Sequence, residues 1–467
     1  MRVSVWLGAV LLFCSGQFLS AQEVASVHAD VLRTDAVTTA PMQTVTVETT
    51  TVETAPAKAA ATESVTVMPS SEPLINPEDV MNGGNLIFQQ QDEPVLVAPD
   101  SVAYQFYIAD LEGRHGAYAP GLSEQLLGLG SVYQEQGLYQ EAIKIFKRAV
   151  HLSRISNGLH SAEQIPILQR LISALVSSGD YEKADERQYY LYRVQRQLYQ
   201  SDAPQMSKAM MDRANWERQA YYLSVGDTAF SRLLAMWELY RRVLSNIAET
   251  EGSYSLQLLQ PLNGLLETQY LIARYNGEAP GGIQFGSGAP ESSAEKNRFA
   301  MVRLSNYKQG QAVIAAIREV HLFNESEESP LAAESLLALG DWRQYHGKRE
   351  AAGEAYLQAW DELAVMENSE QLLAQHFGQP QLLPTTADAH LDLAPPANIK
   401  GYAEVSYSVN QRGRVKALEL VSNEPVEAHP NAEPTRLLRR IKAKKFRPRY
   451  ENREPVTTEN LVKSYAY

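Results

Sequence analysis

The chain has 467 residues, which allows two or three domains, and it carries a formal net charge of −13 at pH 7. Cys14 is the single cysteine, so the sequence excludes intrachain disulfides and metal sites built from cysteines. The charge is uneven: residues 398–467 carry 14 Lys and Arg against 8 Asp and Glu, which leaves a net charge of −19 on the remainder. This asymmetry predicts either a charged partner for the C-terminal part or charge–charge contact between domains.

Residues 1–21 have the pattern of a cleavable signal peptide. Arg2 precedes a mostly apolar stretch over residues 3–13, and Ser20 and Ala21 offer the small side chains of a cleavage site. The apolar stretch is short for a membrane-spanning helix, which needs about 20 residues. We therefore expect export with cleavage of residues 1–21, with an uncleaved inner-membrane anchor as the alternative. No later stretch is apolar enough to span a membrane, so we expect no transmembrane segment in the mature chain.

Residues 22–100 differ in composition from the rest of the chain. A run of Thr, Val and Glu over residues 44–54 and an Ala-rich run over 55–62 contain no aromatic residues. A segment with so little to bury cannot offset the entropy lost on ordering. We expect a disordered, flexible linker, although alternating Thr and Val leave some β-structure open.

Residues 101–378 predict a helical repeat array. Small and large residues recur with similar spacing in three segments, the second of which follows the first after 42 residues. Glycines lie seven residues apart at Gly130 and Gly137, and again at Gly340 and Gly347. Such recurrence is hard to obtain by chance. The positions expected to pack the repeats are Leu126, Gly130, Tyr133, Gly137, Tyr139, Ala142, Phe146 and Ala149, then Leu168, Gly179, Tyr181 and Ala184, and finally Leu336, Gly340, Gly347, Ala352, Tyr356 and Ala359.

This pattern resembles the tetratricopeptide repeat, and its 42-residue period is similar to the longer-helix variant of kinesin-light-chain-like proteins. One helix pair cannot bury its apolar face alone, whereas stacked pairs build a continuous core and a concave surface. The resemblance implies a solenoid that binds protein partners. Residues 206–275 are helical but do not show the glycines of the repeat, and 279–290 predict a loop, so the number of true repeats within 206–330 stays open.

Four tyrosines crowd one predicted helix, at Tyr189, Tyr190, Tyr192 and Tyr199. Packing between helices is the favoured interpretation. The alternative is a groove that grips a peptide, because Tyr is common among the residues that dominate binding energy at interfaces.

The sequence offers nothing typical of an enzyme. It contains no phosphate-binding glycine loop, no zinc-type histidine spacing and no nucleophile elbow. We therefore expect no catalytic residue, no cofactor and no metal.

A linker over residues 379–397 leads to a small domain at 398–467. Its residues 402–409 alternate apolar and polar side chains with the period of a half-buried strand. Gly413 sits in a short loop that predicts a hairpin, and 415–421 is the returning strand. Leu437, Leu438 and Ile441 form the apolar stripe of a cationic helix, which Pro448 is expected to stop, and 461–467 can close the sheet.

This strand–strand–helix–strand order resembles the C-terminal domain of the TonB family, which contacts outer-membrane transporters from the periplasm. The Tyr-Pro that usually precedes the first strand in that family is missing from residues 393–397. The resemblance implies binding of an extended peptide by strand addition to an exposed sheet edge. The candidate edge residues are Leu461, Val462, Lys463 and Tyr465, and it stays equally open that this strand only completes the domain's own sheet.

A basic run over residues 436–453 supplies further candidate binding residues, at Arg439, Arg440, Lys444 and Lys445. A nucleic-acid partner is not expected, because the chain is predicted to be exported and the run matches no reading motif. A solvated helix face, an acidic partner, anionic lipid and the chain's own acidic array all remain open.

The sequence thus predicts a mainly α fold: a helical tetratricopeptide-type solenoid followed by a small α+β, TonB-like C-terminal domain. The expected function is a non-catalytic periplasmic adaptor of a Gram-negative bacterium, linked to outer-membrane transport, with an outer-membrane transporter or a periplasmic peptide segment as partner. Two alternatives are a TonB-type energy transducer, if residues 1–21 are retained as an anchor, and a scaffold for envelope assembly.

Overall fold

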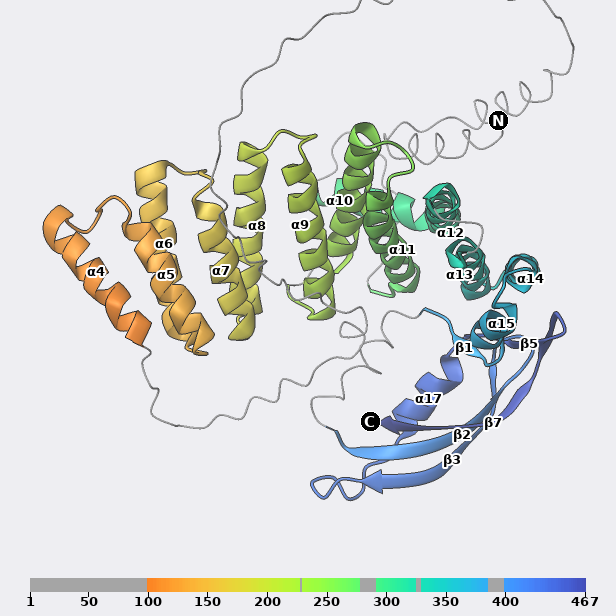
Figure 1. The fold of residues 1–467 in the computed structure, drawn as a ribbon. Helices are drawn as coiled ribbons and strands as arrows, with labels where there is room; N and C mark the ends of the chain where they lie inside the picture. Colours follow the sequence, from red (N-terminus) through yellow and green to blue (C-terminus); the bar gives the residue numbers. More distant parts are fainter. Residues whose placement is uncertain (1–98, 227–228, 278–290, 325–328, 385–398) are drawn as a thin grey trace, which may run out of the picture. The chain divides into compact units, whose positions relative to one another are not determined.

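The computed structural model describes residues 99–226, 229–277, 291–324, 329–384 and 399–467. The predicted signal peptide and almost all of the predicted linker at 22–100 lie outside these residues. Within them, a helical array is followed by a small domain of strands and helix (Figure 1). The predicted fold class, mainly α with a helical solenoid ahead of a small α+β domain, is confirmed.

The helices of the array pack against their neighbours in sequence, mostly as pairs (Figure 1). Helix α4 (Pro99–His115) precedes the pairs, and α15 (Ser369–Phe377) follows them. A short 3-10 helix, η1 (Leu256–Leu258), leads into α11. The pairs are α5 (Leu122–Glu135) with α6 (Tyr139–Asn157), α7 (Gln164–Ser177) with α8 (Tyr181–Leu198), α9 (Pro204–Tyr222) with α10 (Ala229–Thr250), α11 (Leu259–Arg274) with α12 (Glu291–Asn324), and α13 (Leu331–Tyr345) with α14 (Arg349–Ala364).

Three of the turns within pairs share one conformation. Gly137, Gly179 and Gly347 follow α5, α7 and α13 with φ of 76°, 78° and 76°. In the first of these turns, the amide of Leu138 donates to the carbonyl of Tyr133, and the amide of Gly137 donates to that of Gln134. The same two bonds close the other turns, so each helix ends in a Schellman motif that requires a left-handed residue. This requirement explains why glycine recurs at these positions.

Another set of glycines lets helices approach closely. A Cβ atom added to Gly130 would overlap the ring of Phe146, and one added to Gly340 would overlap the ring of Tyr356. In the middle of the array, Gly264 of α11 faces the ring of Tyr240 of α10 in the same way. Residues 206–275 do not show glycines at the spacing expected for the repeat. They nevertheless contain the same kind of contact, between a glycine of one helix and an aromatic ring of the next, at a different position.

The repeat-packing candidates divide by location. Those in the helices are mostly buried, whereas the turn glycines are exposed and the tyrosines that follow or face the turns are half-buried. The buried ones are Leu126, Gly130, Ala142, Phe146, Ala149, Leu168, Ala184, Leu336, Gly340, Ala352, Tyr356 and Ala359, the exposed ones are Gly137, Gly179 and Gly347, and the half-buried ones are Tyr133, Tyr139 and Tyr181.

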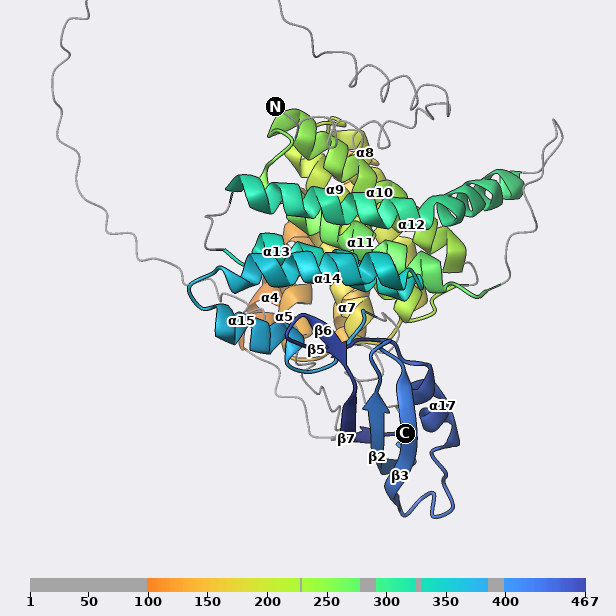
Figure 2. The ribbon, with the colours of Figure 1, turned by 90° about the vertical axis from the view of Figure 1, so that its right-hand side faces the viewer.

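The C-terminal domain is built on a three-stranded antiparallel sheet in the order β3-β2-β7. The strands are β2 (Gly401–Val409), β3 (Val415–Pro425) and β7 (Thr458–Ala466), and helix α17 (Thr435–Ala443) lies against the sheet (Figure 2). The predicted alternation places Ala403, Val405, Tyr407 and Val409 in the core, together with Leu437 and Ile441 of α17.

Two sequence predictions are wrong in detail, and one further element was not predicted. Gln381–Leu382, inside the predicted linker at 379–397, forms strand β1 and pairs with β4 (Phe446–Arg447). Helix α17 ends at Ala443, well before Pro448, because the chain turns into β4. A second small hairpin, β5 (Arg449–Glu451) with β6 (Glu454–Val456), was not predicted. Strands of two or three residues are too short to show a period.

Replacing Gly130 by Ala tests the close helix contacts. The new methyl group would overlap the Phe146 ring, so we expect Gly130→Ala to lower the free energy of unfolding by about 1–3 kcal/mol, as overpacking does. Urea denaturation followed by circular dichroism measures the change.

Gly353→Ala is the matched control, because Gly353 also lies within a helix but has nothing within 4 Å of an added Cβ atom. It should stabilise the chain by about 0.5–1 kcal/mol, the usual gain in a helix interior. Equal effects of the two substitutions would show that the glycine–aromatic contact does not limit packing.

Candidate protein-interaction sites

A buried ion pair joins the array to the C-terminal domain. The guanidinium of Arg447 in β4 donates from Nε to Oδ1 of Asp341 over 3.0 Å and from Nη2 to Oδ2 over 2.7 Å. Each of the two side chains is only 9% exposed. Tyr356 of α14 donates to the same Oδ1 over 2.9 Å, and Arg447 donates from Nη1 to the carbonyl of His376 over 3.2 Å. The two charges are therefore paired in the bidentate geometry that guanidinium and carboxylate favour.

Burial raises the pKa of Tyr356 well above its usual range, and the carboxylate of Asp341 adds to that effect. Tyr356 therefore keeps its proton and remains a donor to Asp341. Burial lowers the pKa of Arg447, but the charge and the hydrogen bonds of Asp341, together with the neighbouring tyrosines, outweigh burial and raise the pKa. Arg447 therefore stays charged where it contacts Asp341.

Further contacts surround this pair. Lys445 donates from Nζ to the carbonyl of Tyr345 over 2.6 Å, and Gln344 donates from Nε2 to the carbonyl of Arg412 over 2.9 Å. The ring of Tyr450 lies 5.9 Å from that of Tyr356. The end of α13, the start of β4 and the hairpin loop of the sheet are therefore connected by several kinds of contact.

Strand β7 lies at one edge of the three-stranded sheet. Its residues Leu461 to Ala466 pair with β2 without interruption, whereas the register shifts before them, next to Asn460 with φ 56°. The opposite edge, β3, has two register shifts against β2 and a positive φ at Ala417. Bulges of this kind disturb an edge, so β7 offers the more regular template for an added strand.

The hydrogen-bond pattern tells which β7 residues face that open edge. Gly401 and Tyr467 exchange both backbone hydrogen bonds, so they form a hydrogen-bonded antiparallel pair. Because such pairs alternate with non-bonded ones, the backbone groups of Val462, Ser464 and Ala466 point away from β2. Within the described residues no strand pairs with them.

The candidate edge residues have different surroundings. Val462 is 55% exposed, Lys463 is exposed and Leu461 is half-buried. Tyr465 is buried, with its hydroxyl 3.5 Å from that of Tyr407. The side chain of Tyr465 therefore belongs to the domain core and cannot meet a partner, which corrects its choice as a binding residue. Alternation along the strand sends it to the inner face.

The candidate residues of the basic run also differ in exposure. Arg439 and Arg440 lie exposed on α17, but Lys444 is buried, with its Nζ over the ring of Tyr465 at 5.2 Å. Burial and then the charge of Arg414 lower the pKa of Lys445, which is half-buried against the array. Lys444 and Lys445 are thus used within the chain rather than presented to a partner. The sequence did not identify Arg447 as a residue of the junction. It lies in a cationic run, and nothing in that run indicates that its partner is Asp341 of the array.

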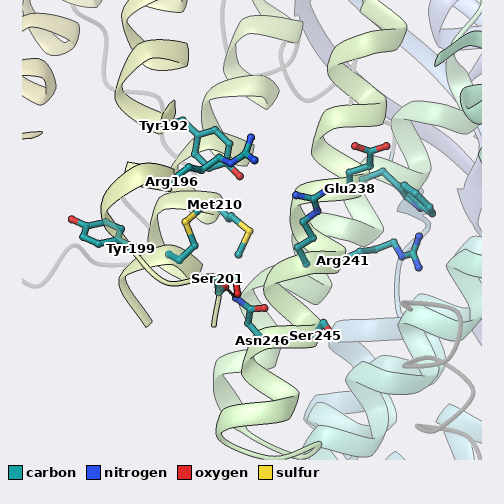
Figure 3. A pocket seen from close by; sticks show the side chains of 12 residues that line it. Tyr192, Arg196, Tyr199, Ser201, Met210, Glu238, Arg241, Ser245 and Asn246 are labelled. Carbon is teal, nitrogen blue, oxygen red and sulfur yellow. Dashed lines mark hydrogen bonds between the residues drawn. The ribbon is translucent and has the colours of Figure 1, made fainter. Parts of the chain in front are cut away.

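The four tyrosines in and just after α8 differ in their surroundings. Tyr190 donates to the carbonyl of Leu159 over 2.9 Å, which is a packing role. Tyr192, and Tyr199 just beyond the helix, line a pocket of about 530 Å³ between α8 and α10 (Figure 3). Tyr190 thus has a packing role, whereas Tyr192 and Tyr199 contribute to the wall of a pocket.

The described residues hold neither a cluster of metal-binding side chains nor a helix suited to cross a membrane. They contain no group of three or more His, Cys, Asp or Glu arranged to hold a metal ion. In the same part of the chain, no helix is both long and apolar enough to cross a membrane.

Removing one partner of the buried ion pair tests the junction. Arg447→Met leaves the Asp341 carboxylate buried without its counter-charge, so we expect a loss of about 3–5 kcal/mol in the free energy of unfolding. Urea denaturation measures the loss, and hydrogen exchange shows whether β4 and the end of α13 open together.

The double variant Asp341→Leu with Arg447→Met removes both charges and should recover most of this loss. As a control, Arg453→Met breaks the pair with Asp361, whose side chains are 55% and 51% exposed, and should cost less than about 1 kcal/mol. A double variant no more stable than Arg447→Met would contradict an energetic coupling of the two charges.

No family model matches the sequence, and no curated protein matches it. Among solved structures, the nearly identical TPR-like repeats assigned to a kinesin light chain of Podosopora anserina share 15% identity, with a TM-score of 0.35, over 52% of this chain and 96% of that one. BtubC (BKLC) from P. vanneervenii shares 12% identity, with a TM-score of 0.33, over 59% of this chain and 94% of that one. These similarities concern the helical repeat fold alone, and the paired helices with their glycine turns make the array tetratricopeptide-like.

Proposed function

We propose that the chain is a non-catalytic adaptor of the bacterial cell envelope, which holds one protein on its helical array and another on the open edge of its C-terminal sheet. The observation that carries this proposal is the position of β7 at a sheet edge, in a domain joined to the array by a buried ion pair. Repeat arrays with this helix pairing present extended surfaces to proteins.

Strand addition is the binding mode that the edge supports. The outward amide and carbonyl groups of Val462, Ser464 and Ala466 would bond to an extended segment, which would become a further strand of the sheet. Backbone bonds would supply the affinity, and the exposed Val462 side chain would contribute to selection. The resemblance to the TonB family favours a periplasmic location, and a segment of an outer-membrane transporter or another periplasmic peptide as the partner.

Ser464→Pro tests strand addition at β7. Proline removes the outward donor while leaving the bonds between β2 and β7 intact, a placement that edge strands tolerate. We expect the immobilised full chain to lose, by at least about tenfold, a protein retained from detergent-solubilised outer membranes. Mass spectrometry of the retained proteins measures this.

Ser464→Val keeps the donor and should retain the same protein. Circular dichroism should show that both variants melt within a few degrees of the parent chain. If the proline variant retains its partner undiminished, binding does not occur by strand addition at this edge.

The intact mass of the protein from cells, with its fractionation, tests the proposed location. A chain that begins at Gln22 and is released with the periplasm is the expected result. A full-length chain held in the inner membrane would overturn the proposal of a free adaptor and favour an anchored energy transducer.

A further inference from the structure

Helix α17 carries its positive charge on one side and its apolar residues on the other. Leu437 and Ile441 are buried in the core of the C-terminal domain, and the helix lies along one face of the sheet (Figure 2). The outward side chains of α17 are exposed, and the cations among them form what we call the cationic face: Arg436, Arg439, Arg440 and Lys442. This face is therefore fixed to a folded domain by the apolar side of the same helix.

Most of the cationic face is not neutralised within the described residues. In that part of the chain, no acidic side chain forms an ion pair with Arg436, Arg439 or Lys442. The first turn of α17 contains no acidic residue, although a helix N-terminus favours negative charge. No Asp or Glu occurs between Glu433 and Glu451.

The spacing of these cations is unfavourable for an isolated helix. Arg436 lies three residues before Arg439 and four before Arg440, and Arg439 lies three before Lys442. Like charges at these spacings are neighbours on a helix surface and destabilise the helix. A face that only contacted water could mix charges of both signs and avoid this cost. The arrangement is that of a surface which meets a negatively charged partner.

The cationic face also lacks the anchors of a protein interface. Helix α17 has no aromatic residue and no exposed large apolar side chain, and such residues supply most of the binding energy between proteins. It is one side of a nine-residue helix, and its outward surface is therefore convex. A layer of lipid headgroups presents many phosphates in one plane, which can move laterally to meet each cation. Clusters of about four to eight Lys and Arg on an amphipathic helix are typical of binding to anionic lipids.

We propose that the cationic face of α17 docks on a membrane surface that contains anionic phospholipids, with its four cations at the lipid phosphates. The charges of the two surfaces are complementary, and this complementarity carries the inference. Leu437 and Ile441 stay in the domain core, so the helix lies on the headgroups and does not insert. The contact would hold the C-terminal domain at a bilayer, and it does not depend on strand addition at β7.

Vesicle co-sedimentation with the expected mature chain, residues 22–467, tests this. Vesicles of phosphatidylcholine with about one third phosphatidylglycerol should bind the chain at least about tenfold more tightly than vesicles of phosphatidylcholine alone. Raising the salt from about 0.1 M to about 1 M shortens the Debye length from about 10 Å to about 3 Å and should release the chain. Equal binding to the two kinds of vesicle, or no binding to either at low salt, would overturn the proposal.

A triple variant locates the contact. Arg436→Gln, Arg439→Gln and Lys442→Gln in combination should weaken binding to the anionic vesicles by at least about tenfold, because three cations near the headgroups are lost. The three side chains are exposed, so circular dichroism should show an unchanged helix content.

The matched control combines Arg170→Gln, Arg193→Gln and Lys308→Gln, which removes the same charge at exposed positions of the array. It should weaken binding less than about twofold, since these side chains are not on the cationic face. Equal losses in the two triple variants would trace binding to net charge and would contradict a site on α17.

Other polyanions separate a lipid partner from an acidic protein or a nucleic acid. Polyglutamate and a duplex DNA, at the same concentration of negative charge as the vesicles, should each bind at least about tenfold more weakly than the vesicles. Tighter binding of either one, with the same loss in the α17 triple variant, would assign the cationic face to that class and overturn the assignment to lipid. Ser464→Pro should bind vesicles as the parent chain does, and loss of binding in that variant would also contradict the site on α17.

Discussion

Arg447 and Asp341 are both almost inaccessible to solvent, and the interior of a protein tolerates such charges only as partners. One comes from the second half of the C-terminal domain and the other from the last helix pair of the array. If either element were absent, the other would have an unpaired charge at a position that is buried here, which is costly. The neighbouring strand pair, β1 with β4, and the hydroxyl of Tyr356 add contacts to the same arrangement. This ion pair thus connects the C-terminal sheet domain to the last helix pair of the array.

The sequence predicted those features that repeat or alternate. Gly137, Gly179 and Gly347 recur because a Schellman motif needs a left-handed residue, and this requirement is local. The alternation in β2 likewise follows from one buried face. The Arg447–Asp341 pair could not be found in this way, because its partners are 106 residues apart and no periodicity links them. A cationic run is also ambiguous in sequence, since exposed and buried arginines look alike until their partners are known.

The pocket between α8 and α10 shows a second limit of sequence reasoning. The crowded tyrosines raised the possibility of a groove, but the residues that complete it come from helices without repeat glycines at the expected spacing. Hydrogen bonds of Arg232 to Asp185 and of Asn246 to Ser201 connect its walls, and the whole of helix α9 lies between the members of each pair in sequence. In the same region the ring of Tyr240 packs against Gly264. Helix α10 therefore contributes both to packing between helices and to the wall of the pocket.

Strand β1 has a consequence for how such proteins can diversify. It lies between the array and the sheet in sequence, and it pairs with β4, which follows helix α17 in the C-terminal domain. A genetic crossover placed in the intervening segment, at the apparent domain boundary, would separate β1 and Asp341 from β4 and Arg447. Recombination there would yield chimaeras whose halves each lack a strand partner and a counter-charge. A recombination event would keep these partners together only if it transferred α13, β1 and β4 as one segment. The segment that must be inherited together is therefore longer than either domain.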